Sequence, residues 1–213
     1  MPKRPPSSLD AAAGCAREDL LTGVREAYAA LPGYARFVED WPRDGVRGAP
    51  CGERRGVGLS VLKYLGAAIE TMRAHATGLA AALERAAPTL CWRQTYGPGE
   101  IGADFLDNYG WAELVGLRGI LRSERLACGI LLLGPHTSYP RHRHPAEELY
   151  LPLSGTAAWQ RGDEPWREIS PGSAVHHRGD EPHAMRTMAE PLLAAYVWCG
   201  AGIGRKSRLD ADG

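Results

Sequence analysis

The feature that most constrains the fold is a series of short apolar runs that follow one another closely after Pro88. Turn-forming residues such as Gly, Pro and Asp separate the runs, and no helical stripe lies between them. Closely spaced strands without intervening helices favour an antiparallel barrel or sandwich over a parallel sheet. The expected strands cover residues 91–96, 117–121, 126–133, 148–152, 156–161, 173–177, 183–187 and 192–198.

The residues before Pro88 have the period of helices instead. Apolar residues at steps of three or four define two helices, whose stripes are Leu20, Val24, Ala27, Tyr28 and Leu31, and then Leu62, Leu65, Ile69, Met72, Leu79 and Leu83. Neither helix can bury its stripe alone, so both are expected to pack together or on the barrel. We therefore predict a mainly β fold of the α+β class, with a helical segment at residues 1–88, a barrel at 89–204 and a frayed tail at 205–213.

The charge balance limits the partners that the protein can have. Lys plus Arg and Asp plus Glu both number 25, so the formal net charge is zero. No broad basic field exists to attract nucleic acid or anionic lipid, and we expect a small-molecule partner. The N-terminus lacks the apolar stretch of a signal peptide, and the run at 126–133 is too short to span a bilayer. These observations favour a cytoplasmic protein and leave a homodimer open.

The cysteines are odd in number and widely spaced, and none forms a CxxC pair. This spacing indicates neither a zinc knuckle nor a disulfide framework, so we expect reduced thiols. The five cysteines are Cys15, Cys51, Cys91, Cys128 and Cys199.

A cluster of histidines predicts a metal site. His142 and His144 are two residues apart, and on a strand this spacing directs both rings to the same face. Glu148 follows at an even step and is preferred over Glu147 for that reason. Two neutral imidazoles and a carboxylate suit a divalent first-row metal, and His183 is the expected fourth donor from a distant strand. The ligand types do not decide the metal: Zn or Fe is preferred, and Mn, Ni or Co also fits.

The remaining histidines have ordinary interpretations. A proline turn precedes His183, which favours it over His176 and His177 as the distant ligand. We expect His176 and His177 to be strand or turn residues, and we assign no role to His75 or His136.

The motifs around these ligands resemble those of a known superfamily. His142-x-His144-x3-Glu148-x6-Gly155 resembles the first cupin motif. Pro171-Gly172, followed by Glu181-Pro182-His183, resembles the second. The resemblance implies a jelly-roll barrel, also called a double-stranded β-helix, with the metal at its mouth.

A longer stretch is similar to one cupin family. The residues from Tyr139 to Gly155, and from His176 to Arg186, resemble the dimethylsulfoniopropionate lyases of the DddQ type, as does a helical segment before the barrel. Members of that family cleave dimethylsulfoniopropionate to dimethyl sulfide and acrylate. The resemblance implies that His144, Glu148 and His183 are the core metal ligands and that His142 lies beside them. It also implies that Tyr150 is close to or on the metal and that Tyr139 and Trp198 line the substrate pocket.

The chemistry of such a β-elimination fits the residues. A base must remove a proton α to a carboxylate, and a divalent metal can stabilise the resulting charge. Tyr150 lies two residues beyond Glu148, hence on the same face. A nearby cation would lower its pKa from about 10, which makes it the expected base, with Tyr139 as the second candidate. Aromatic faces suit a sulfonium cation, and the candidates are Trp198, Trp159, Tyr139 and Tyr196. Tyr64 lies off its helical stripe and is kept as a further substrate contact.

Two other functions use the same ligands. One is a cupin dioxygenase or isomerase that acts on another small carboxylate or a sugar. The other is a cupin without catalytic activity that binds a small ligand. The pair of Tyr139 and Tyr150 matches a catalytic pattern, so we favour a carbon–sulfur lyase.

Overall fold

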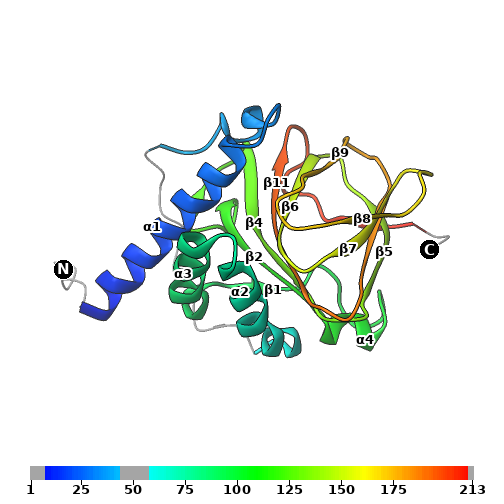
Figure 1. The fold of residues 1–213 in the computed structure, drawn as a ribbon. Helices are drawn as coiled ribbons and strands as arrows, with labels where there is room; N and C mark the ends of the chain where they lie inside the picture. Colours follow the sequence, from blue (N-terminus) through cyan, green and yellow to red (C-terminus); the bar gives the residue numbers. More distant parts are fainter. Residues whose placement is uncertain (1–7, 44–57, 211–213) are drawn as a thin grey trace.

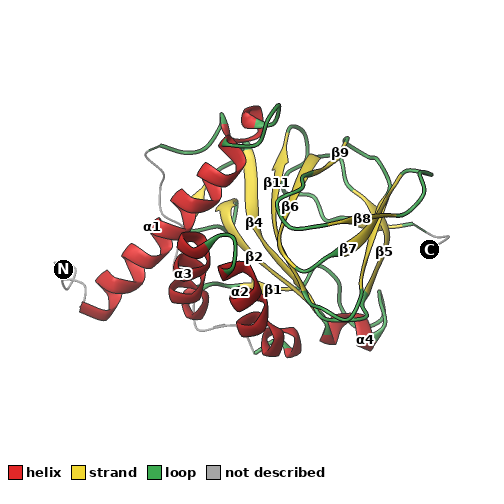
Figure 2. Ribbon diagram, viewed as in Figure 1, coloured by secondary structure: helices red, strands yellow, loops and turns green. Residues whose placement is uncertain are grey.

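The computed structural model describes residues 8–43 and 58–210. It consists of two mainly antiparallel sheets that face each other and a layer of helices on the outer side of the larger sheet (Figures 1 and 2). Residues 1–7, 44–57 and 211–213 lie outside this description. No helix in the described ranges combines the length and the apolar character that crossing a membrane requires.

The helical layer packs on the barrel through apolar side chains. It comprises α1 (Ser8–Ala29), η1 (Ala35–Val38), η2 (Ser60–Tyr64), α2 (Leu65–Arg73), α3 (Thr77–Ala86) and η3 (Ala87–Thr89). Leu20, Met72 and Leu83 are buried in one core with residues of the large sheet. A hydrogen bond also joins the two layers, because the buried Tyr28 hydroxyl donates to the Leu149 carbonyl at 3.1 Å.

The second helix is divided where the sequence predicts one continuous stripe. A turn at Ala74–Ala76 separates α2 from α3, and neither Gly nor Pro stands in it. His75 lies in this turn with its Nε2 2.8 Å from the carbonyl oxygen of Leu153. The helix is therefore broken where this turn contacts the barrel. Helical periodicity alone does not reveal such a tertiary contact.

The larger sheet has the order β1-β2-β4-β11-β6-β9, with β3 paired to β2. Its strands are β1 (Trp92–Arg93), β2 (Tyr109–Gly116), β3 (Leu121–Arg122), β4 (Leu126–Leu133), β6 (Glu147–Ser154), β9 (Val175–His177) and β11 (Leu192–Cys199). Every residue of β4 is buried. Ile130 and Leu132 face the helices, and Leu131 and Leu133 face the barrel interior, which explains the continuous apolar run of this strand.

The smaller sheet closes the other side of the barrel in the order β12-β5-β10-β7-β8. Its strands are β5 (Ser138–Arg143), β7 (Ala157–Arg161), β8 (Arg167–Ile169), β10 (His183–Thr187) and β12 (Arg208–Leu209). The short helix α4 (Ala103–Asp107) lies at one end of the barrel (Figure 1).

The C-terminal residues differ from the predicted frayed tail. Arg208 and Leu209 pair with Arg143 and His142 of β5, so they add a strand to the small sheet. Asp210 lies 2.7 Å from Arg143 Nε and 3.3 Å from Arg141 Nε. The prediction was wrong for these residues because their polar composition resembles a solvated end, while their backbone is satisfied by an edge strand.

The cysteines differ in part from the expectation of reduced thiols. Cys15, Cys128 and Cys199 are free, whereas Cys91 is disulfide-bonded. Sequence spacing alone does not show which cysteines come together in space. The absence of a CxxC pair therefore does not exclude a disulfide bond between distant cysteines.

Removal of the Tyr28 hydroxyl is expected to loosen the attachment of the helical layer. Tyr28→Phe keeps the ring but leaves the buried Leu149 carbonyl without this donor, and the free energy of unfolding should fall by about 1 kcal/mol. Chemical denaturation measures the change. Tyr34→Phe is the matched control, since its ring packs against Phe37 and no hydrogen bond of its hydroxyl is found among the described residues. Equal stabilities of the two variants would contradict the prediction.

Candidate metal centre and active-site cavity

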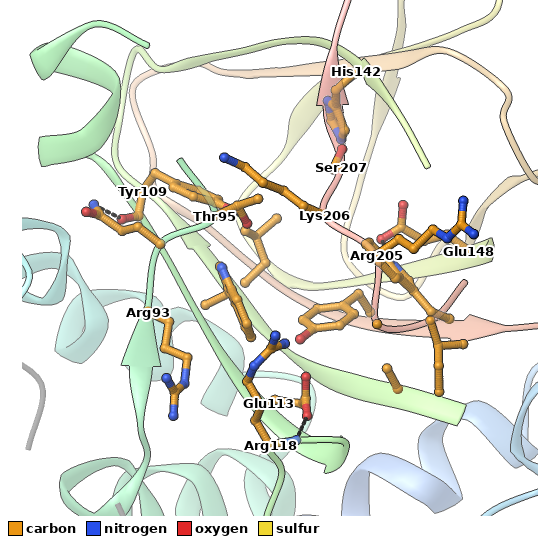
Figure 3. A pocket seen from close by; sticks show the side chains of 18 of the residues that line it. Arg93, Thr95, Tyr109, Glu113, Arg118, His142, Glu148, Arg205, Lys206 and Ser207 are labelled. Carbon is orange, nitrogen blue, oxygen red and sulfur yellow. Dashed lines mark hydrogen bonds between the residues drawn. The ribbon is translucent and has the colours of Figure 1, made fainter. Parts of the chain in front are cut away.

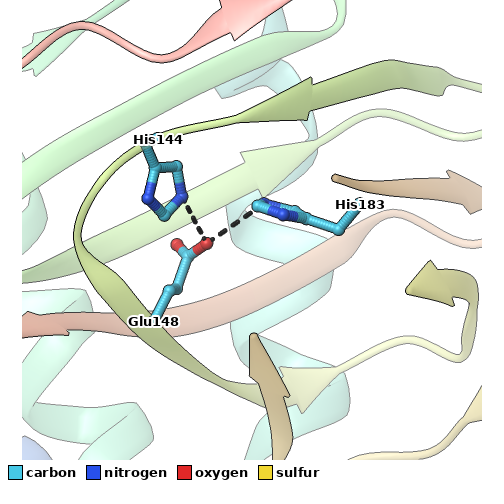
Figure 4. A group of neighbouring side chains, drawn as sticks. All are labelled: His144, Glu148 and His183. Atoms are coloured by element: carbon cyan, nitrogen blue, oxygen red, sulfur yellow. Dashed lines mark hydrogen bonds and ion pairs between the residues drawn. The ribbon is translucent and has the colours of Figure 1, made fainter. Parts of the chain in front are cut away.

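Three predicted ligands meet inside the barrel. His144 lies in the turn between β5 and β6, Glu148 is on β6, and His183 is the first residue of β10. All three are buried, and one potential ligand atom of each lies within 4.8 Å of those of the other two. In Figure 4 both imidazole rings point at the carboxylate of Glu148.

Backbone carbonyls fix the orientation of the two rings. His144 Nδ1 is 2.9 Å from the Ala146 oxygen, and His183 Nδ1 is 2.8 Å from the Glu181 oxygen. A carbonyl oxygen only accepts, so each Nδ1 carries the hydrogen. In the neutral ring, Nε2 therefore presents a lone pair toward Glu148, which is the tautomer that metal-binding histidines use.

The centre needs a cation or protons between these atoms. Nε2 of His144 is 2.9 Å and Nε2 of His183 is 3.2 Å from the same oxygen, Oε2 of Glu148. The second contact lacks hydrogen-bond geometry, which leaves the buried His183 Nε2 without a hydrogen-bond partner among the described residues. Lone pairs that face a carboxylate repel it unless positive charge lies between them, so this donor set fits a divalent metal ion.

The pKa values respond to the same arrangement. Burial alone would raise the pKa of Glu148, but the charge and hydrogen bond of His144, together with the close approach of His183, outweigh burial and hold it well below its usual range. Burial alone would lower the pKa of His144, but Glu148 raises it. Without a metal, the carboxylate thus favours a proton on His144, and a metal ion would replace this proton.

His142 lies beside this group rather than in it. Its ring centroid is 4.2 Å from that of His183 and 6.4 Å from that of His144. It stacks on Tyr139, with 4.0 Å between the centroids and 13° between the planes. Burial, and then the charge of His183, lower the pKa of His142 well below its usual value, so its ring is neutral.

The pairing of strands directs further side chains to the centre. Glu148 of β6 is opposite Trp198 of β11 on one side and His177 of β9 on the other, and directly paired residues share a face. Trp198 Nε1 donates to Glu148 Oε1 at 2.5 Å and its ring stacks on His144 at 3.9 Å. His177 stacks on His183 at 4.0 Å. Trp198 and His177 therefore brace the proposed ligands from both sides.

The next row of the same sheet carries Tyr150 and Tyr196, which are paired across β6 and β11. Burial raises the pKa of Tyr150 well above its ordinary value, and the carboxylate of Glu148 adds to this. Tyr196 lies over Gly129 of β4, where a β-carbon would be 2.6 Å from its hydroxyl oxygen. Gly129 thus makes room for a phenol on the barrel floor.

A cavity of about 360 Å³ opens onto the proposed metal centre (Figure 3). Its inner end is lined by His142, Glu148, Tyr150, Tyr139 and Trp198. Residues 203–207, which the sequence analysis assigned to the end of the barrel and the tail, form part of its wall. This size is suited to a small molecule.

Comparison with known proteins agrees with this architecture. The family model for dimethylsulfoniopropionate lyases matches residues 49–194. A structure from work on the DMSP lyases RdDddP and RnDddQII superposes with a TM-score of 0.81 at 33% identity, covering 93% of this chain and 99% of that one. The chain belongs to the dimethylsulfoniopropionate lyase family. The predicted cupin barrel with an N-terminal helical segment is thereby confirmed.

Other relatives are similar over shorter regions. The DMSP lyase DddQ of Ruegeria pomeroyi is 38% identical over 109 residues, which are 51% of this chain and 54% of that protein. Its crystal structure superposes with a TM-score of 0.75 at 28% identity and covers 92% of this chain. The putative DMSP lyase DddL of Cereibacter sphaeroides is 34% identical over 72% of this chain and 63% of its own length. The chain thus spans between half and two thirds of these curated relatives.

One residue that was predicted to contact the substrate, Tyr64, lies outside the cavity. Tyr64 is at the end of η2, packs against the helix-side core and is not among the residues that line the cavity. The helical period placed it off the stripe, but the residue contacts the region of Gly134 instead, where a β-carbon would be 2.9 Å from its ring. We therefore remove Tyr64 from the substrate-binding set.

Sequence reasoning missed one residue beside the centre and one in the cavity wall. His177 is fully buried, and neither ring nitrogen has a hydrogen-bond partner among the described residues. Trp111 of β2 lines the cavity, but the strand itself was expected at 117–121 rather than at Tyr109–Gly116. The alternation of Tyr109, Trp111 and Glu113 is the signal that could have revealed this strand.

Successive side chains of β6 point to opposite sides of the sheet, so the neighbouring carboxylates of Glu147 and Glu148 lie in different surroundings. Glu147 lies outside the barrel, where Arg36 forms a two-point contact with it at 2.6 and 2.9 Å and His176 Nε2 is 2.7 Å away. The hydrogen bond of Arg36 is the main cause that lowers the pKa of Glu147 to about 2. This contact fixes the strand at the position directly before Glu148.

Metal content tests the ligand assignment. We expect about one divalent metal per chain in the purified protein and loss of most of it in Glu148→Ala, because removal of a ligand opens the site and weakens binding by an order of magnitude or more. Elemental analysis measures occupancy. The control is Glu147→Ala, which removes the adjacent carboxylate outside the barrel and should keep the metal. Full occupancy in both variants would show that Glu148 is not a ligand.

The Arg36–Glu147 pair should stabilise the fold only above acidic pH. The pKa of Glu147 is lower in the folded protein, about 2, than its ordinary value of 4.5, so the stabilisation is present above the unfolded pKa and is lost as the pH falls toward the folded one. A double-mutant cycle with Arg36→Gln and Glu147→Gln measures the coupling energy. We expect about 1 kcal/mol or less at neutral pH, given the exposure of the pair, and a decline between about pH 5 and about pH 2. A coupling independent of pH would be inconsistent with this assignment.

Proposed function

We propose that this protein cleaves dimethylsulfoniopropionate to dimethyl sulfide and acrylate by β-elimination, with one divalent metal held by His144, Glu148 and His183. The observation that carries the proposal is the pair of Nε2 lone pairs directed at one buried carboxylate oxygen, at the inner end of a cavity that Tyr150 lines. Membership of the dimethylsulfoniopropionate lyase family supports the choice of substrate. Zn or Fe is the preferred metal, and Mn, Ni or Co also fits these ligands.

The proposed reaction requires one base and one leaving group. Tyr150 takes the proton from the carbon α to the substrate carboxylate, the α and β carbons form a double bond, and the bond to sulfur breaks as dimethyl sulfide leaves with the electron pair. The leaving group is neutral, so it needs no proton from the protein. When bound, the metal supplies positive charge that stabilises the enolate-like carboxylate and lowers the pKa of a neighbouring phenol.

The protein around Tyr150 makes that positive charge necessary. Burial and Glu148 raise the pKa of the phenol in the protein alone, so the phenolate does not form readily there. His142 is neutral and adds no positive charge to compensate. We therefore expect the base to function only in the metal-loaded protein.

The remaining cavity residues have simpler roles in this proposal. Tyr139 is held by stacking on His142, and its hydroxyl lies 3.4 Å from that of Tyr96 and 3.5 Å from that of Tyr109. Trp198 uses its N–H on Glu148, which leaves its ring as a wall of the cavity. Aromatic walls without charge suit the sulfonium group. We further propose that the enzyme acts in the cytoplasm on this small molecule alone, without nucleic acid or membrane partners, and the homodimer remains an untested prediction.

The decisive experiment measures dimethyl sulfide above metal-loaded protein. Tyr150→Phe keeps the ring and its packing but removes the oxygen that accepts the proton, so kcat should fall by about 10² or more. Tyr34→Phe is the control outside the barrel and should retain activity. Metal analysis of both variants separates loss of the base from loss of the metal.

Two outcomes would change the proposal. Wild-type kcat in Tyr150→Phe would remove this residue as the base and make Tyr139 the leading candidate. A wild-type protein that carries metal but releases no dimethyl sulfide would favour a cupin dioxygenase or isomerase, and oxygen consumption or turnover of a sugar would then be measured.

A further inference from the structure

The cavity wall carries more positive charge than the proposed reaction requires. Three arginines line it, and Figure 3 shows Arg93 and Arg118 on the side of the cavity where Glu113 lies, with Arg205 nearer to Glu148. We call Arg93, Arg118 and Arg205 the arginine rim. No salt bridge joins any of them to a carboxylate in the described part of the chain, although the chain as a whole is neutral.

The carboxylates near the rim offset its charge only in part. Glu148 and Glu113 are the acidic residues among those that line the cavity, and Glu148 belongs to the proposed metal centre. Glu113 Oε1 accepts the backbone N–H of Arg118 at 2.5 Å, and the charges of Arg118 and Arg93 act on this carboxylate without forming a salt bridge to it. The fourth cation of the cavity, Lys206, forms an ion pair with Glu100.

The turn that carries Arg118 is held in place. Gly116 has a φ of +142°, and a β-carbon there would be 2.6 Å from Glu113 Oε1. At Gly119 a β-carbon would be 2.7 Å from the Leu114 carbonyl oxygen. The backbone therefore wraps closely around the Glu113 carboxylate, and Arg118 starts from a fixed position at the cavity mouth.

Arg93 is placed by the sheet, next to an unused hydrogen-bond donor. It pairs with Trp111 across β1 and β2, so both side chains lie on the same face of the sheet and line the cavity. The Nε1–H of Trp111 is buried and has no partner among the described residues. Guanidinium groups that form no salt bridge, beside an N–H without a partner, are a set of donors that matches an anion.

We propose that the arginine rim and Trp111 form a binding subsite for a small carboxylate, separate from the metal centre. The subsite takes an anion of one carboxylate group, which under the proposed function is acrylate on its way out of the cavity; that identity rests on the proposed function, whereas the carboxylate chemistry does not. A carboxylate accepts hydrogen bonds from two guanidinium groups at once, and a sulfonium cation is repelled by them. The Glu113 side of the cavity, with Arg93 and Arg118, thus differs in charge from the wall that the aromatic rings form beside the proposed metal centre.

Binding of propionate tests the subsite. Propionate has the carboxylate but no leaving group, so the full-length, metal-loaded protein does not convert it, and ligand-observed NMR gives its dissociation constant. Arg93→Gln/Arg118→Gln should weaken binding by about tenfold or more through the loss of two charge-assisted hydrogen bonds. Arg122→Gln/Arg125→Gln is the charge-matched control, since both arginines are exposed and neither lines the cavity. This control should bind as the wild type does.

Removal of the metal shows whether propionate binds at the arginine rim or at the metal centre. If the rim is separate, propionate binding in the wild-type protein persists after treatment with a chelator. Its loss with the metal, or equal affinities of the two double variants, would overturn the proposal. In steady-state assays acrylate should inhibit the rim variant about tenfold less than the control. An enzyme without lyase activity would contradict the proposed function but leave the propionate result to decide on the subsite.

Discussion

The buried carboxylate of Glu148 is the group on which the rest of the centre depends. A carboxylate without a partner is costly to bury, and here four groups surround it: two histidine nitrogens at one oxygen, the Trp198 indole at the other, and Tyr150 beside them. Since the backbone carbonyls oblige the Nδ1 atoms to donate, the lone pairs on the other side of each ring must be matched by a proton or a metal ion. The barrel thus surrounds a position that must hold positive charge, either a proton or a metal ion.

The sheets explain why these groups meet although they are far apart in the sequence. Glu148 and Trp198 are separated by fifty residues but are directly paired across β6 and β11. His183 arrives on the opposite sheet, where it pairs with His142. A slip of one residue in β6 would exchange Glu148 with Glu147, and the contact of Glu147 with Arg36 on the outside opposes such a slip. Register, more than any single bond, therefore maintains the centre.

The sequence allowed the ligands to be predicted because their spacing is local. The two-residue step from His142 to His144 and the even step to Glu148 can be interpreted from strand periodicity alone. His177 could not be assigned in this way, because only the pairing of β9 with Glu148 shows which of two adjacent histidines faces inward. The strand β2 was misplaced since apolar residues continue past Gly116, whereas the glycine turn that ends the strand wraps around the half-buried Glu113. Local sequence patterns thus predicted the metal-ligand residues. The residues of the cavity wall could be identified only from the pairing of strands that lie far apart in the sequence.

One of those walls has a consequence for how the protein reaches its working form. Residues 203–207 and the strand β12 follow all proposed ligands in the sequence, and β12 is an edge strand attached to β5. During synthesis the ligands emerge first, and the segment that forms this wall of the cavity emerges later. The last residues of the chain therefore help to set how wide the entrance to the proposed centre is, although they supply none of its ligands.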